Sequence, residues 1–274
     1  MDSTALLKRV DELPRLPKAV SELLDAVNDE NTSVKGIATK VSHDPLISAR
    51  VLRLANSAHF GRSREVGSID EAVIRLGMQT LRTLVIASAV IGAIPKVEGV
   101  DLATFWGETF EVALYCQELA KRCGAAQDAA FTCGILHNIG DLLIAVISPE
   151  EASQIRDAIA AGGVKPEVEA EILGFTGAEV GAILAQNWKF TPELVQGIRF
   201  QNNAKKSEPF SKLAALLGMA HRLVTNWDQV AEDDKTSWLS QQATSSGLKM
   251  DMGGLTAKLT ELRGQGFEIG QQLA

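Results

Sequence analysis

The sequence predicts an all-α protein, and three observations support this fold class. Leu, Ala, Ile and Val dominate the chain, while aromatic residues make up only 5% of it, a balance that favours helices over a β-sandwich. Apolar residues recur at intervals of three and four, and no segment fits the alternating pattern of a strand better than the helical one. At 274 residues and 46% apolar, the chain can bury a substantial core in one large or two small domains.

The first half of the chain divides into helices at recognisable start and stop signals. Asp44 followed by Pro45 is typical of an N-cap and a first helical residue. Ser68 with Glu71 three residues later indicates a capping box, and Gly77 indicates the end of that helix. Residues 1–12 are expected to form a short helix or an arm. The expected helices then cover about 17–28, 33–41, 44–56, 68–77, 78–94 and 101–123.

The second half begins with the most apolar stretch that also carries polar groups, Ala129 to Ile147, which we expect to be one buried helix. Glycine and proline residues separate the helices after it. Residues 227–274 are more polar and have weaker helical periodicity. The expected helices are about 150–161, 166–173, 176–188, 192–199 and 209–225, with weaker ones near 234–242 and 253–264.

Four polar or reactive side chains lie within the apolar stretch: Cys133, His137, Asn138 and Asp141. On a continuous helix His137 would lie one turn from both Cys133 and Asp141, because residues four apart share a face. A buried polar group without a partner costs about 1–3 kcal/mol, so this cluster requires an explanation. It is the first candidate for a functional site.

Charge and cysteine content narrow the classes of partner and compartment. A net charge of −7 argues against a general nucleic-acid-binding protein, although a small anion held by local residues remains compatible with it. Three cysteines in a long chain do not indicate a disulfide framework and favour a reducing compartment. The N-terminus lacks a signal-peptide pattern, and the run from Leu84 to Pro95 is too short to cross a bilayer. We therefore expect a cytoplasmic protein with neither nucleic acid nor membrane as a partner.

Six short motifs follow one another along residues 13–225. They are Leu13-Pro14-x-Leu16-Pro17, Asp44-Pro45-Leu46 with Asn56-Ser57, Ser68-Ile69 with Gly77, Trp106, Leu136-His137-x-Ile139-Gly140, and Val180-Gly181 with Trp188. Together they resemble the HDOD family, the HD-related output domains of bacterial signalling proteins. The resemblance implies a two-lobed helical bundle of the HD type over 13–226, with lobes at about 13–97 and 98–226. The arm of 1–12 precedes this domain, and a helical extension, 227–274, follows it.

The resemblance also implies a cleft near His137 in which the metal site of HD hydrolases has degenerated. The His-Asp doublet of such enzymes is His137-Asn138 here, and a position that is often His in relatives is Glu108. Later positions where relatives often carry His align with Gly177, Gln201 and Asn202. The residues predicted for the degenerate cleft are Trp106, Glu108, His137, Asn138, Asp141, Gln201 and Asn202.

These losses predict a non-catalytic signal-transduction module rather than an enzyme, with no metal and no cofactor. Its expected partners are unidentified signalling proteins, and a small-molecule ligand in the cleft is a further candidate. The alternative is a metal-dependent phosphohydrolase of the HD superfamily acting on a nucleotide or phosphoester, in which Glu108, His137 and Asp141 re-form a weak site. A pure oligomerisation scaffold is a third interpretation. A zinc site at Cys133 and His137, with Cys116 and Cys123 nearby, is a fourth.

Overall fold

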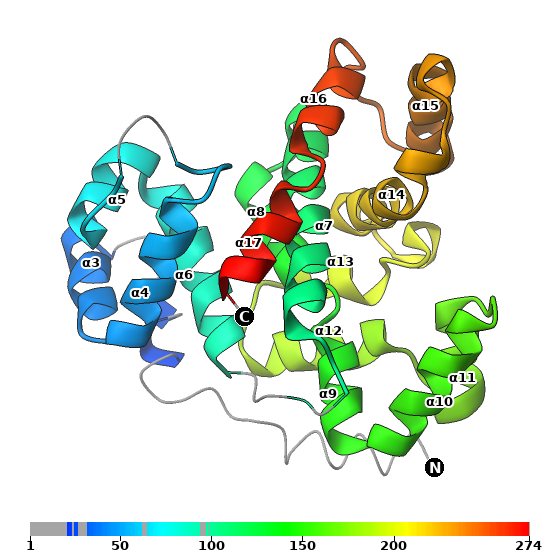
Figure 1. Ribbon diagram of the computed structural model, residues 1–274, viewed down its shortest axis with the longest axis horizontal. Helices are drawn as coiled ribbons and strands as arrows, with labels where there is room; N and C mark the ends of the chain where they lie inside the picture. Colours follow the sequence, from blue (N-terminus) through cyan, green and yellow to red (C-terminus); the bar gives the residue numbers. More distant parts are fainter. Residues whose placement is uncertain are drawn as a thin grey trace. The chain divides into compact units, whose positions relative to one another are not determined.

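The computed structural model describes residues 21–23, 25–26, 32–61, 65–93, 97 and 99–273. All regular structure within these ranges is helical, which confirms the predicted all-α class (Figure 1). The arm predicted at 1–12 and most of the helix predicted at 17–28 lie outside the described residues. The helices are α3 (Val34–Ser42), α4 (Pro45–Ala55), α5 (Ile69–Leu76), α6 (Met78–Ala93), α7 (Leu102–Arg122), α8 (Gln127–Leu136), α9 (Ile139–Ile147), α10 (Pro149–Ala160), α11 (Lys165–Leu173), α12 (Gly177–Asn187), α13 (Pro192–Arg199), α14 (Lys212–Asn226), α15 (Lys235–Ser245), α16 (Leu255–Leu262) and α17 (Gln265–Leu273).

The described residues form two compact units. The first unit contains 97, 99–101 and 112–261, and the second contains the described part of 14–95 together with 102–111 and 262–273. Helix α7 therefore contributes its first half to the second unit and its second half to the first unit. The lobe boundary expected near residue 97 and the extension expected from residue 227 stay predictions.

The second unit begins its helices where the local signals predict. The Asp44 carboxylate accepts hydrogen bonds from the backbone N–H groups of Leu46 and Ile47, both at 3.0 Å. The Ser68 hydroxyl accepts from the N–H of Glu71 at 3.1 Å, whereas the Glu71 carboxylate accepts from the N–H of the residue preceding Ser68. Helix α6 follows and is the most deeply buried element of this unit, with ten buried residues.

The last helix, α17, lies within the helical extension expected at 227–274, but its bounds and its membership of the second unit were not predicted. The buried Glu111 carboxylate on α7 accepts hydrogen bonds from the N–H groups of Gly264 and Gly266, at 2.8 and 2.9 Å. A Cβ atom added at Gly270 would lie 2.2 Å from the backbone nitrogen of Gly107 on α7. The two helices thus approach through glycines, and a carboxylate satisfies the free N–H groups at the beginning of α17.

The first unit is built around α9, α12, α13 and α14, which pack in that order. The predicted single helix at 129–147 is wrong, because α8 ends at Leu136 and α9 begins at Ile139. By length and composition, the stretch Gln127–Ile147 is apolar enough to cross a membrane, but 83% of its 18-residue window is buried inside the structure. Such burial is the property of a core helix pair, and it places the two residues between α8 and α9 deep in the unit.

Candidate functional site

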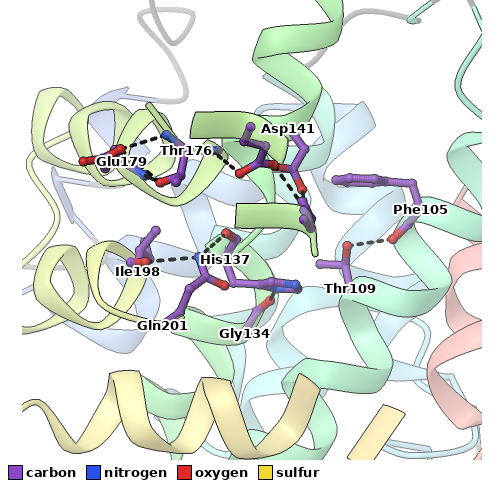
Figure 2. A network of polar contacts seen from close by, with 12 residues as sticks. Phe105, Thr109, Gly134, His137, Asp141, Thr176, Glu179, Ile198 and Gln201 are labelled. Carbon is purple, nitrogen blue, oxygen red and sulfur yellow. Dashed lines mark hydrogen bonds and ion pairs between the residues drawn. The ribbon is translucent and has the colours of Figure 1, made fainter. Parts of the chain in front are cut away.

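The interruption between α8 and α9 consists of the polar doublet, His137 and Asn138. The imidazole Nδ1 of His137 lies 2.5 Å from the carbonyl oxygen of Gly134. The side-chain amide of Gln201 donates to the carbonyl oxygens of His137, at 2.8 Å, and Ile198, at 3.1 Å (Figure 2). Side-chain donors therefore satisfy the carbonyl oxygens of Gly134 and His137 at the break, which lowers the cost of burying this interruption.

A cavity of about 540 Å³ opens beside this break. Five of the seven residues predicted for the cleft line it: His137, Asn138, Asp141, Gln201 and Asn202. The other lining residues come from α10 to α12 and from α14, all within the first unit. They are Ile159, Val164, Lys165, Pro166, Glu169, Ala178, Gly218, His221, Arg222, Thr225 and Asn226.

The remaining two predicted residues, Trp106 and Glu108, belong to the second unit. Trp106 is buried and Glu108 is exposed on α7. Neither is among the residues that line the cavity described above. Their expected position at the same cleft as His137 stays a prediction.

Two imidazoles face each other in the cavity. The rings of His137 and His221 have centroids 4.5 Å apart and an interplanar angle of 75°, an edge-to-face arrangement. Because a carbonyl oxygen only accepts, the contact with Gly134 assigns the proton of neutral His137 to Nδ1 and leaves Nε2 as an acceptor. Burial, opposed by this hydrogen bond and reinforced by Lys165, lowers the pKa of His137 from 6.5 to about 4. Burial, followed by the neighbouring His137, also lowers the pKa of His221, so both rings are neutral at pH 7.

A charged cluster lies at another part of the same cavity. Asp141 forms an ion pair with Lys165, whose ammonium nitrogen also lies 3.9 Å from the carboxylate of Glu169. Glu169 is buried and accepts a hydrogen bond from the backbone N–H of Gly177 at 2.9 Å. Burial, reinforced by the charge of Asp141 and opposed by Lys165, raises the pKa of Glu169 to about 7. The cluster therefore contains one cation for two carboxylates, one of which is partly protonated at neutral pH.

Glycines on α9 and α12 create the space for this cluster. A Cβ atom at Gly177 would lie 2.0 Å from a carboxylate oxygen of Asp141, so any larger residue there would displace the carboxylate. At Gly140 a Cβ atom would lie 2.0 Å from the carbonyl oxygen of Gly177 and 2.7 Å from the nitrogen of Gly181. Backbone-to-backbone packing of α9 on α12 thus fixes the position of Asp141.

Sequence reasoning missed four charged or titratable residues of the cavity: Lys165, Glu169, His221 and Arg222. One signal could have identified His221. It is one of only four histidines in the chain, and it follows Ala220 within the apolar pattern of the expected helix 209–225. No local signal relates Lys165 or Glu169 to His137, because α10 and α11 bring them to the cavity.

The cysteines do not gather with the histidines in the part of the chain that the structure describes. Cys116 and Cys133 are buried free thiols, and Cys123 is partly exposed. Burial raises the pKa of Cys133, which disfavours the thiolate that a zinc site requires. Within the described ranges, no group of three or more His, Cys, Asp and Glu side chains has the geometry to hold a metal ion.

The helical fold, the His137-Asn138 doublet and the cavity beside it define an HD-like domain. The sequence profile of the HDOD domain matches residues 13–204, most of the chain. The chain therefore belongs to the HDOD family, a family associated with signal transduction.

Several known proteins are similar to this chain. A Shewanella amazonensis SB2B protein, described as a candidate phosphohydrolase, has a crystal structure with 60% identity and a TM-score of 0.93, covering 100% of this chain and 99% of that one. An HDOD domain protein of Geobacter sulfurreducens, of unknown function, shares the fold at 22% identity and a TM-score of 0.82, covering 99% of this chain and 97% of that one.

A curated relative also matches over most of this chain. The protein, an uncharacterized one from Treponema pallidum (strain Nichols), is 27% identical over 226 residues, which is 81% of this chain and 44% of that protein. The chain thus spans less than half the length of the curated relative that it matches.

Proposed function

We propose that this chain is a non-catalytic bacterial signalling module that acts by binding other proteins, and that a small ligand in the cavity gates those contacts. Membership of the HDOD family supports the signalling role. The cavity supports the ligand, because about 540 Å³ lined by apolar groups and convergent polar groups is typical of small-molecule sites.

The observation that carries the non-catalytic half of the proposal is the ion pair between Asp141 and Lys165. A hard divalent cation needs several anionic or strongly basic ligands, and the doublet supplies a neutral amide, Asn138, where HD enzymes have a carboxylate. The carboxylate of Asp141, three residues further along the chain, is already neutralised by the ammonium group of Lys165. The donors of this cavity therefore do not fit the metal site of an HD hydrolase, and we derive no catalytic step from them.

A metal-dependent phosphohydrolase acting on a nucleotide or phosphoester is the second candidate. Two observations favour it. The Shewanella protein at 60% identity is described as a candidate phosphohydrolase. In addition, His137 and His221 are neutral imidazoles in one cavity, and neutral imidazole is a metal ligand. This candidate predicts bound metal and metal-dependent turnover, both of which the first candidate excludes.

Two measurements on the purified protein separate the candidates. Elemental analysis of protein prepared without chelator determines the bound metal, and hydrolysis of bis(4-nitrophenyl) phosphate with added Mn²⁺ determines turnover. We expect neither stoichiometric metal nor turnover above background. His43→Ala is the control, because His43 is an exposed residue at the C-terminal end of α3. Turnover that is lost in His137→Ala and retained in His43→Ala would establish the enzyme instead.

Ligand gating is tested separately from catalysis. A thermal-shift screen of small metabolites should identify a compound that raises the melting temperature, because a ligand specific for the folded state stabilises it by mass action. A protein captured by this chain should then bind more tightly or more weakly when that compound is present. If no compound shifts the melting temperature but the captured protein binds normally, the chain is a scaffold whose contacts no ligand controls.

A further inference from the structure

A second cavity, of about 280 Å³, adjoins the larger one in the first unit. The two cavities share four lining residues, Gln201, Asn202, Gly218 and Arg222. The larger cavity contains two carboxylates, whereas the lining of the smaller one, taken from the described residues, includes no Asp or Glu. The smaller cavity instead has a guanidinium, an ammonium and several neutral hydrogen-bonding side chains.

Arg222 is the half-buried cation at the junction of the two cavities. Its Nε donates to the side-chain oxygen of Gln242 at 2.6 Å, and its Nη2 donates to the hydroxyl of Ser246 at 2.5 Å. Both partners are neutral. Among the residues that the structure describes, no carboxylate forms an ion pair with Arg222. The described partners therefore hold the guanidinium in one orientation without supplying a neutralising charge, which is costly for a partly buried cation.

The remaining nitrogen of the guanidinium, Nη1, lies beside Gly218. A Cβ atom added at Gly218 would be 3.5 Å from Nη1 and 2.8 Å from the carbonyl oxygen of Gln201. The absence of a side chain at this position therefore leaves open the space next to Nη1. Since Gly218 lines both cavities, that space is continuous with each of them.

Lys205, exposed on the short helix η2 (Ala204–Lys206), provides a second cation in the lining of the smaller cavity. Asn203 and Ser245 add neutral polar groups to the same lining. Arginine presents a planar fork that matches the oxygens of phosphate or carboxylate, and lysine adds a mobile point charge. The whole chain has a net charge of −7, which disfavours binding of a long polyanion. The local positive charge of this lining is still compatible with a small anion.

We infer that the smaller cavity binds the oxyanion end, phosphate or carboxylate, of a small ligand whose uncharged part lies in the larger cavity against the two histidines. Arg222 is the anchor of this anion, Lys205 is its second cationic contact, and Gly218 provides the space through which the ligand passes from one cavity to the other. The inference names the ligand class of the proposed function and rests on it for the occupant of the larger cavity.

The experiment titrates the wild-type protein with inorganic phosphate, and separately with acetate, at constant ionic strength maintained with chloride. Binding is followed by melting temperature and by amide NMR shifts. We expect a saturable response to at least one of the two anions, and the anion that gives it identifies the chemistry of the ligand's charged end. Arg222→Gln should abolish the response, and Lys205→Gln should weaken the affinity about tenfold. Lys206→Gln changes the neighbouring exposed lysine, which does not line either cavity, and should bind as the wild type does.

Lys205→Gln preserves a test even if Arg222→Gln folds poorly, because Lys205 is exposed and makes no hydrogen bond on which a helix depends. An unsaturable response, or an equal one in the wild type and Lys205→Gln, would overturn the inference. The titration needs only the anion site. Retained anion binding with a failed metabolite screen would therefore reject ligand gating alone, and an organic ligand whose affinity is unchanged in Arg222→Gln would reject the anion site alone.

Discussion

Acidification should destabilise the protein through His137, and the structure sets the size of the effect. The pKa of this imidazole is 6.5 in the unfolded chain and about 4 in the fold, mainly because of burial. Between these values the unfolded state binds the proton and the folded state does not, so the free energy of unfolding decreases as the pH falls from 6.5 to 4. A pKa difference of about 2.5, at 1.36 kcal/mol for each pH unit, gives about 3 kcal/mol.

The assay is urea unfolding of the wild type and of His137→Gln at a series of pH values between about 4 and 7. Glu169 and the groups distant from His137 contribute to both proteins, so the difference between the two curves reports the titration of His137 together with its coupling to His221. The wild type should lose about 3 kcal/mol relative to the variant across this interval.

A difference between the two proteins that does not change with pH would refute the reasoning. So would a ¹⁵N NMR spectrum at pH 6 that shows a protonated His137, because a pKa of about 4 requires a neutral ring at that pH.

Three further predictions concern the stability of the fold. Asp44→Ala should lower the free energy of unfolding by about 0.5–2 kcal/mol in denaturant melts, and Asp44→Asn should be nearly neutral, because one side-chain oxygen accepts both capping hydrogen bonds. Gly140→Ala should lower the free energy of unfolding by at least about 1–3 kcal/mol, because its Cβ atom would lie 2.0 Å from a backbone oxygen. The control Gly181→Ala, whose Cβ atom has contacts of 3.4 Å or more, should be neutral or slightly stabilising. Equal melts of the two variants would contradict the packing argument. Glu169→Gln should gain stability relative to the wild type as the pH rises from 4.5 to 7, by up to about 3 kcal/mol, because the raised pKa makes ionisation of Glu169 unfavourable in the fold; a pH-independent difference would refute this.

The sequence predicted the elements whose signals are local. The caps at Asp44 and Ser68 depend on residues two or three positions away, so a single sequence is enough to place them. The break at His137 depends instead on Gln201, 64 residues further on, and on the close packing of Gly140 against Gly177. The apolar periodicity continues on both sides of the break, and this continuity is why one helix was predicted where two occur.

The missed residues have the same cause. Helix α17 has a polar sequence, and a carboxylate on α7, more than 150 residues earlier, satisfies its first N–H groups. His221 and Lys165 reach the cavity only because α14 packs on α8 and α13, and because α11 packs on α10, which in turn contacts α9. The sequence could therefore predict half of the site, the doublet with its neighbours, while the partner half depends on tertiary packing that no local pattern encodes.

The chemistry of the site is best understood from the positions that the family resemblance aligns with histidines. At Gln201 the side chain now donates to the carbonyl oxygen of His137 and so stabilises the helix break. At Gly177 the missing side chain leaves the space that the carboxylate of Asp141 occupies next to Lys165. Under the proposed function, these two positions no longer provide metal ligands. Gln201 instead provides a hydrogen bond to the helix break, and Gly177 provides the space in which Asp141 pairs with Lys165. Arg222, whose described hydrogen-bond partners are neutral, is the exception, so an anionic ligand is the occupant that would complete the charge balance of the smaller cavity.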